Sequence, residues 1–438
     1  MKRKMERISV LFLATIILAV TVGTAETTWS TSLEEQSRNR EADVRVRAES
    51  SPNDPYWSWQ WGSKKTLTDW AWNTTVGGSD VLVAIIDSGI DYTHQDLAAN
   101  YVPLGYDWVN SDPYPMDDYD HGTKVAGIIA AQINNGKGIA GLAQVKIMAE
   151  KVLNNAGEGS IDDLASGIRH ATDKGAKIIS MSLSAPDNDT ALYTAVQYAY
   201  AKNVLLVAAA GNYRNNTKRY PAAYDEVIAV TSTNQSDQKA PSSNYGSWVE
   251  LAAPGVDIFT TALPNEDLPF PYRYYRYGSG TSYACAHASG LAALVWSAFP
   301  NATRDWIRNR LRETADDLGD PGFDEYYGYG RINARKAITI NGTSPAINYT
   351  LTITTTAGGT TSPSQGTYPY PQGEIVSVQA IPNTEYAFDH WELDNTKIGA
   401  TNPINVTMDK NHTLYAFFVF VSLDDTDGGG GSRPPLAT

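Results

Sequence analysis

Apolar runs of strand length alternate with helical patterns through most of the chain up to about residue 341. The clearest runs lie at Val81–Ile86, Lys177–Ser182, Val204–Ala209 and Val227–Val230. Between them, Ser160 with a carboxylate three residues later is typical of a helix start. Near-continuous apolar strands separated by helices indicate a parallel sheet with helices on both faces. We therefore predict an α/β domain at residues 54–340, with its chemistry at the carboxyl ends of the strands.

The pattern changes after Asn341 to alternating apolar and polar residues in segments rich in Thr, Tyr, Gly and Pro. Such alternation is typical of half-buried strands, so we predict a small all-β domain at residues 349–421. Residues 341–348 are expected to form a linker. Residues 422–438, acidic and then rich in Gly and Pro, are expected to form a flexible tail.

The N-terminal residues 1–25 show the three parts of an export signal. A basic start is followed by the uncharged, mostly apolar run Ile8–Gly23 and by small residues up to Ala25. The alternative is a retained membrane anchor, but the run is shorter than the roughly 20 apolar residues of a bilayer span. We therefore expect a removed signal peptide and a secreted protein. The polar residues 26–53 are interpreted as a short pro-segment or a linker.

Charge and cysteine content exclude two classes of function. The formal net charge is −14, which argues against a nucleic-acid partner because phosphate binding needs clustered Lys and Arg. The chain has one cysteine, so an internal disulfide and a zinc site built on several cysteines are excluded. Additional stabilisation must come from the core or from metals that bind oxygen.

Asp87 and His121 occupy positions where a chemical role competes with a structural one. Asp87 directly follows the apolar run Val81–Ile86, where a carboxylate needs a partner. His121 precedes an apolar helical face and is expected at a helix N-terminus, where the dipole disfavours a permanent cation and a neutral imidazole suits a general base. Taken singly, each is also explained as a satisfied structural residue.

Ser282 and Asn212 pose the same choice. Ser282 lies in a loop of small residues that leads into the apolar segment Gly290–Phe299, so its hydroxyl is expected beside free helix amides that stabilise an oxyanion. Asn212 follows the run Val204–Ala209 and could donate to the same oxyanion. The alternative for the Ser282 loop is that its glycines serve close packing at a helix start. The alternative for Asn212 is a turn, in which an Asn after Gly takes the left-handed conformation.

The four residues together are far more specific. Asp87, His121 and Ser282 follow the chain order found in subtilisin. With Ala210-Gly211-Asn212, their sequence blocks resemble the motifs of the subtilisin family of serine peptidases (subtilases), in its thermitase-like form. The resemblance implies a serine endopeptidase in which Ser282 is the nucleophile, His121 the general base and Asp87 the residue that orients it. It also implies Asn212 as a donor to the oxyanion, and protein or peptide substrates.

The resemblance also implies where substrate binds. The residues concerned are Ser182, Leu183, Ser184, Ala210, Gly211 and Arg219. The family commonly has a small or neutral residue where this chain has Arg219. If its guanidinium points into the pocket, we expect a preference for Glu or Asp at P1, the substrate residue before the scissile bond. If it reaches solvent, the pocket stays broad and apolar.

Some positions depart from the family pattern. Ala286 stands in place of a proline after the serine, Ser184 in place of a glycine, and residues 26–53 are too short for the usual folding pro-domain. The altered residues after Ser282 and the missing pro-domain leave a second hypothesis open, in which an inactivated subtilase serves as a binding scaffold. The intact Asp87, His121, Ser282 and Asn212 favour the active enzyme.

Family resemblance also implies structural calcium, as one or two ions. The first site would use side-chain oxygens and main-chain carbonyls, which suit Ca²⁺. Its residues would be Asp54, Asp96 and Asn135 with side chains, and Ile133, Lys137 and Ile139 with carbonyls. The second site would lie in the loop that contains Asp107, Asn110 and Asp112, where Asn110 replaces a family carboxylate. Solvated turns are the alternative at both places.

The segment Tyr349–Phe420 resembles the divergent InlB-type β-repeat of bacterial and archaeal surface proteins. The matching features include Gly358-Gly359, Phe388-Asp389-His390-Trp391 and Thr407-Met408-Asp409. His390 and Trp391 are expected to serve packing rather than catalysis. The resemblance implies a spacing or adhesive role, with contact to a cell surface or polymer. We expect the whole chain to be a monomer.

Overall fold

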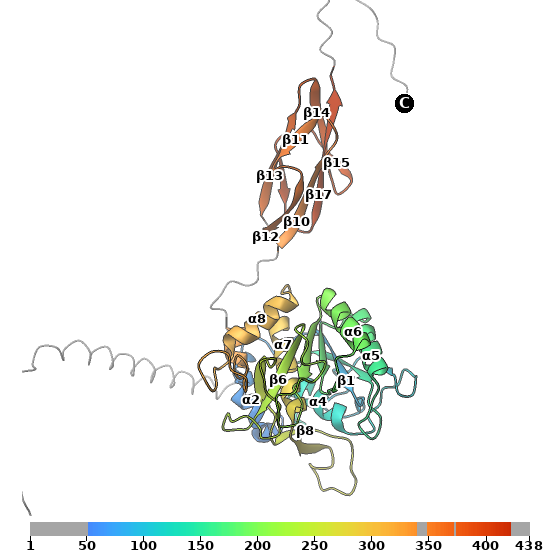
Figure 1. Ribbon diagram of the computed structural model, residues 1–438, viewed down its shortest axis with the longest axis vertical. Helices are drawn as coiled ribbons and strands as arrows, with labels where there is room; N and C mark the ends of the chain where they lie inside the picture. The colour runs from blue at the N-terminus through green and yellow to red at the C-terminus, as the bar shows by residue number, and fades with distance from the viewer. Residues whose placement is uncertain (1–50, 340–347, 372–373, 422–438) are drawn as a thin grey trace, which may run out of the picture.

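The computed structural model describes residues 51–339, 348–371 and 374–421 (Figure 1). The predicted signal peptide, the linker apart from Asn348, the tail and nearly all of residues 26–53 lie outside these ranges. Within them, no helix combines the length and the apolar character needed to span a membrane.

The first domain is built on a seven-stranded parallel sheet in the order β2-β3-β1-β4-β5-β6-β7, which confirms the α/β prediction. Its strands are β1 (Leu82–Asp87), β2 (Tyr106–Asp107), β3 (Lys146–Lys151), β4 (Ile178–Met181), β5 (Leu205–Ala209), β6 (Val227–Thr233) and β7 (Leu251–Pro254). The apolar runs named from the sequence became β1, β4, β5 and β6. These strands are buried on both faces, and their near-continuous apolar sequences follow from that.

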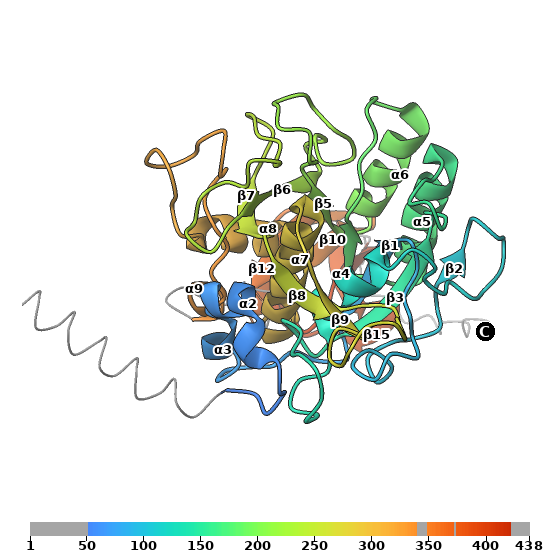
Figure 2. The same cartoon turned by 90° about the horizontal axis from the view of Figure 1, so that it is seen from below.

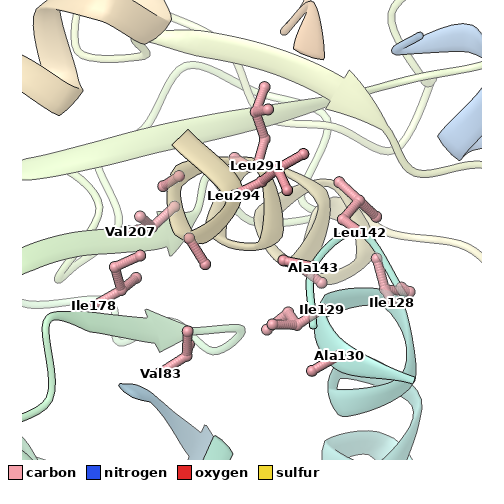
Figure 3. Close-up of a cluster of buried hydrophobic side chains, with 14 of the residues drawn as sticks. Val83, Ile128, Ile129, Ala130, Leu142, Ala143, Ile178, Val207, Leu291 and Leu294 are labelled. Carbon is pink, nitrogen blue, oxygen red and sulfur yellow. The ribbon is translucent and has the colours of Figure 1, made fainter. Parts of the chain in front are cut away.

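Helices cover both faces of the sheet. On one face lie α4 (His121–Ala130), α7 (Thr281–Ala298) and α8 (Arg304–Thr314), and on the other α5 (Ile161–Asp173) and α6 (Thr190–Ala201), side by side (Figure 2). Figure 3 shows Leu291 and Leu294 of α7 in the same buried cluster as Val207 and Ile178 of the sheet. Ser160 begins α5 as predicted, because its hydroxyl accepts from the Asp163 amide at 3.0 Å.

Short elements complete this domain. They are a 3₁₀ turn η1 (Trp57–Trp59), the helices α2 (Trp61–Lys65), α3 (Thr68–Ala71) and α9 (Ala334–Ile338), and the hairpin of β8 (Ile258–Thr261) and β9 (Tyr275–Gly278).

The C-terminal residues form an all-β unit with its own core, as the alternating pattern predicted. A five-stranded sheet has the order β12-β10-β17-β14-β15, and a three-stranded sheet the order β11-β13-β16. The strands are β10 (Asn348–Thr355), β11 (Gly359–Ser362), β12 (Gly366–Pro371), β13 (Ile375–Pro382), β14 (Tyr386–Leu393), β15 (Thr396–Gly399), β16 (Ile404–Thr407) and β17 (His412–Phe420). Trp391 is fully buried in this core, and the His390 ring stacks on Phe417.

Candidate active site

Asp87 and His121 meet at the carboxyl end of the strand β1. Asp87 is the last residue of β1 and His121 the first of α4, and the His121 Nδ1 lies 2.8 Å from the buried Asp87 Oδ1. The glycine after the histidine allows this approach, because a Cβ at Gly122 would lie 2.0 Å from the carbonyl oxygen of Gly89. The sequence His-Gly therefore lets α4 begin directly beside the end of β1.

Ser282 is the second residue of α7, and the first turn of this helix lies beside His121. The His121 and Tyr283 ring centroids are 6.2 Å apart. The Ser282 Oγ donates to the Ser182 carbonyl at 3.0 Å, and the Ser182 Oγ donates to the Ser282 carbonyl at 3.0 Å. The hydroxyl hydrogen of Ser282 is thus directed at the segment after β4 in this arrangement, and it must rotate to reach the imidazole.

Asn212 is oriented by the residue before Ser282. Its amide oxygen accepts from the Thr281 amide at 2.9 Å and from the Thr281 hydroxyl at 3.2 Å. The Thr281 hydroxyl in turn accepts from the Gly211 amide at 3.1 Å. These bonds use the oxygen of the Asn212 amide, so its NH₂ group is the part that can donate to a ligand.

Two adjoining cavities run along these residues. A cavity of about 280 Å³ is lined by Ser182, Leu183, Ser184, Ala209, Gly211, Asn212, Tyr213, Thr281 and Ser282. A larger one of about 610 Å³ shares Ser182–Ser184, Asn212 and Tyr213 and adds His121, Tyr119 and residues around Gly157 and Leu164. The structure therefore brings together His121, Asn212, Ser282 and the predicted substrate segment 182–184. Ala210, by contrast, is fully buried and lines neither cavity.

Arg219 lies against the wall of the smaller cavity through Tyr213. Its guanidinium carbon is 3.8 Å from the centre of the Tyr213 ring, and its Nε is buried without a hydrogen-bond partner. The side chain therefore takes an intermediate pose, neither fully in solvent nor among the cavity-lining residues. Sequence reasoning missed Tyr213, although its place directly after Asn212 was a usable signal.

The electrostatics suit a base at His121 and exclude one alternative nucleophile. Burial opposes protonation of His121, but the charge and hydrogen bond of Asp87 outweigh it and raise the His121 pKa above its ordinary value. The thiol of Cys285 is fully buried, and burial raises its pKa to about 11. A protonated, inaccessible thiol is a poor nucleophile.

The loop predicted for the first calcium ion gathers two buried carboxylates. Asp54 accepts from the amides of Asn134 and Asn135 at 2.8 and 3.2 Å. Asp96 accepts from the Asn135 side-chain amide at 2.9 Å and from the Ile139 amide at 3.0 Å. Burial raises the pKa of Asp54, and the charge of Asp96 adds to this rise. A cation between the two carboxylates would relieve this repulsion, so these residues fit calcium.

The loop predicted for the second ion fits less well. Both carboxylate oxygens of Asp107 accept from Asn110, one from its amide N–H and one from its side-chain NH₂, each at 2.9 Å. Asp112 accepts from the Tyr114 amide at 2.8 Å. Asp107 is buried but Asp112 is only half-buried, so this loop does not bring two buried carboxylates together as the first loop does. Among the residues that the structure describes, no group of three or more His, Cys, Asp or Glu side chains is placed to hold a metal.

Comparison with known proteins agrees with this geometry. Residues 78–330 match the subtilase family model, and residues 349–421 match the divergent InlB B-repeat domain. The chain is 45% identical over 291 residues to a thermophilic serine proteinase of Bacillus sp. (strain AK1). The aligned region covers 66% of this chain and 69% of that protein. The chain is 42% identical to thermitase of Thermoactinomyces vulgaris over 290 residues, 66% of this chain and 99% of thermitase.

A third relative, the halolysin-like extracellular serine protease Nep of Natrialba magadii, is 38% identical over 295 residues, 66% of this chain and 53% of that protein. The family match spans more than half of the chain, and the similarity covers nearly all of thermitase. The chain therefore belongs to the subtilase family of serine endopeptidases.

Proposed function

We propose that Asp87, His121 and Ser282 form the catalytic triad with which this chain hydrolyses peptide bonds. His121 takes the proton of the Ser282 hydroxyl as the oxygen attacks the substrate carbonyl, and later returns it to the leaving amine. Asp87 holds the imidazole through its bond to Nδ1 and stabilises the imidazolium. The observation that carries the proposal is the 2.8 Å contact between His121 and the buried Asp87, beside the first turn of the helix that carries Ser282.

The oxyanion of the intermediate would be stabilised by two kinds of donor. The first is the Asn212 NH₂ group, which the bonds from Thr281 to the amide oxygen leave free to donate. The second is the backbone N–H of Ser282 at the start of α7, where the helix dipole also favours negative charge. Removal of one such donor typically costs a hundredfold or more in kcat, on the order of 3 kcal/mol.

The substrate would bind along Ser182, Leu183 and Ser184, with its P1 side chain in the smaller cavity. Gly211 and Tyr213 would form part of that cavity's wall, with Arg219 stacked behind Tyr213. Ala210, fully buried, would support this wall from inside. Before attack, the Ser282 hydroxyl must leave the Ser182 carbonyl, and a substrate strand that pairs with this segment would compete for that carbonyl.

A fluorophosphonate probe, which reacts only with an activated serine, tests the triad. We expect the purified protein to be labelled, and Ser282→Ala and His121→Ala each to abolish labelling and peptide hydrolysis. Their double variant should be little worse than either single variant, since triad members act as a unit. Ser279→Ala is the matched control, because this nearby exposed serine bonds to Asp257 instead and should leave labelling unchanged. A folded wild-type protein that takes no label would favour the inactivated scaffold.

Calcium stabilisation and export belong to the same proposal. Asp54, Asp96 and Asn135, with carbonyls of Ile133, Lys137 and Ile139, would hold one ion and so fasten the N-terminal segment to the loop after α4. Calcium supplies charge neutralisation there, not chemistry. The Asn135 amide must turn its oxygen towards the ion, because its NH₂ group faces Asp96 in this structure. Asp107, Asn110 and Asp112 form a weaker candidate for a second ion.

Export is supported by the signal-like N-terminus and by a relative that is named an extracellular protease. We further propose that the all-β unit contacts a cell surface or a polymer, as its match to the InlB B-repeat suggests.

A further inference from the structure

Asp117 is a buried carboxylate in the loop that leads into α4, and the triad does not include it. Its side chain is 4% exposed. Its two oxygens accept hydrogen bonds from the Ser88 and Thr123 hydroxyls at 2.8 and 2.6 Å and from the amides of Tyr119, Asp120 and Thr123 at 3.0, 3.0 and 2.9 Å. Such a complete set of donors fixes the carboxylate in one place and compensates for its burial.

These bonds hold the start of the helix that carries His121. Asp120, the residue before α4, makes no side-chain cap and has a positive φ of 83°. Two amides of the first turn, those of Gly122 and Thr123, instead donate to side chains outside the helix. Asp117 accepts from the Thr123 amide, and the Ser88 hydroxyl, itself donating to Asp117, accepts from the Gly122 amide at 2.9 Å. Ser88 follows Asp87 directly, so this network ties the carboxylate end of β1 to the histidine end of α4.

Asp117 also contributes charge. The groups that face His121 are Asp87 from β1, Asp117 from the preceding loop, Lys124 from α4 and Tyr283 from α7. Burial lowers the His121 pKa, whereas Asp87 and, to a smaller extent, Asp117 raise it. Lys124 acts in the opposite sense and is paired with Asp120 at 2.6 Å, and burial raises the pKa of Tyr283, so this ring is neutral.

We propose that Asp117 is a positioning residue, which caps the helix that begins at His121 and stabilises, through its negative charge, the imidazolium formed during the reaction. The inference rests on the proposed triad. It predicts two separable effects, because the hydrogen bonds determine where His121 lies and the charge determines how readily it is protonated.

The test is the pH profile of kcat/KM for Asp117→Asn. The amide keeps part of the bonding and loses the charge, so the imidazolium is less stable and the His121 pKa falls. Because the base must be neutral, activity then persists to lower pH. We expect the acidic limb to move down by roughly 0.5 pH unit and kcat to fall by about tenfold, with KM little changed. Asp118→Asn is the matched control, since Asp118 is 48% exposed and pairs with Lys151 instead.

Ser88→Ala separates the two effects and serves if Asp117→Asn does not fold. It removes the relay to Gly122 and keeps the charge, so kcat should fall while the acidic limb stays in place. The proposal is overturned by an Asp117→Asn protein that is folded but has an unshifted limb, by an equal shift in Asp118→Asn, or by a full kcat in Ser88→Ala. Fluorophosphonate labelling of the wild type distinguishes these failures from a failure of the proposed triad, which would leave the wild type unlabelled.

Discussion

At the scale of single residues, Arg219 makes the pocket of this chain distinctive. Its Nε is buried without a partner, and its guanidinium rests on Tyr213, which lines the cavity beside Ser282. A P1 carboxylate would give this group the hydrogen bonds it lacks, and the low local dielectric would strengthen the pair. We therefore expect kcat/KM for Glu at P1 to exceed that for Leu in matched peptides by roughly tenfold, about the effect of one charged hydrogen bond.

The variants that check this prediction are Arg219→Gly and Lys218→Gly. The first should reverse the preference, because no cation then remains behind Tyr213 to pair with a P1 carboxylate. The second removes an exposed neighbouring charge and should change the preference for Glu over Leu only slightly. The comparison thereby separates ion pairing in the pocket from a general attraction of acidic peptides to the protein surface. A wild-type protein that prefers Leu or Phe, with no change in Arg219→Gly, would show that the guanidinium stays on Tyr213 and outside the pocket.

The residues that sequence could identify share a simple local signal. Asp87, His121 and Ser282 stand at the end of a strand or the start of a helix, beside apolar runs that predict those ends. Asn212 follows the end of β5 by three residues. Asp117 gives no such signal. It lies among other aspartates in a loop, and its role depends on Ser88 and Thr123, which only the folded chain brings to it. Tyr213 and Arg219 likewise meet only across the pocket wall.

At the scale of elements, the loop at residues 133–139 joins the N-terminal segment to the end of α4. Besides Asp54, Asn53 also bonds to this loop, through Asn134 and Gly136. A bound ion would stabilise these contacts by mass action, by about 2.7 kcal/mol at a hundredfold excess over Kd. We expect EGTA, which removes calcium, to lower the Tm by roughly 5–10 °C in a thermal-unfolding measurement. Variants in each candidate loop must then show which site is responsible.

Paired variants make this distinction. Asp96→Asn should have a lower Tm that EGTA no longer changes, whereas Asp112→Asn, in the second candidate loop, should keep the response to EGTA. If instead Asp112→Asn loses the response to EGTA and Asp96→Asn keeps it, the ion binds in the second loop. A wild-type Tm that is indifferent to EGTA would mean that the Asp54 and Asp96 carboxylates rely on their internal hydrogen bonds alone.

The strand β3 shows why some elements escape a search for apolar runs. Its sequence ends in Glu150 and Lys151, yet both side chains are buried. The Lys151 Nζ donates to the carbonyls of Ser88 and Leu153 and to Asp118, and Glu150 accepts from Trp108 and pairs with His170. In the sequence, charged residues such as these predict exposed positions, because their buried partners are not visible there. Lys151 thereby also braces the turn after Asp87, close to the proposed triad.

At the scale of the whole molecule, two units with separate cores share one chain. The α/β domain has large clusters on the two faces of its sheet, and the core of the all-β unit draws on its own strands. Among the described residues, no strand of either unit joins a sheet of the other. Sequence composition predicted this division, because a change from buried strands to alternating ones marks a change of architecture.

We expect residues 51–340 to fold and to keep the peptidase activity of the full chain. Its last helix, α9, closes the α/β domain, since Ala337 and Ile338 are buried there and Arg310 of α8 donates to the carbonyls of Lys336, Ala337 and Thr339. The truncated protein should match the full chain in kcat/KM on a short peptide within about twofold, a difference of less than 0.5 kcal/mol.

A second truncation, at residue 330, provides the control. It removes Ile332 and the whole of α9, which begins at Ala334, and it leaves their buried apolar contacts open to water. This shorter protein should unfold at a lower temperature or fail to fold. If instead residues 51–340 fail to fold while the full chain folds, the all-β unit stabilises the catalytic domain. If they fold but lose activity only on a cell-surface or polymer-bound substrate, the unit acts by holding the enzyme near that substrate, through effective concentration rather than through the active site.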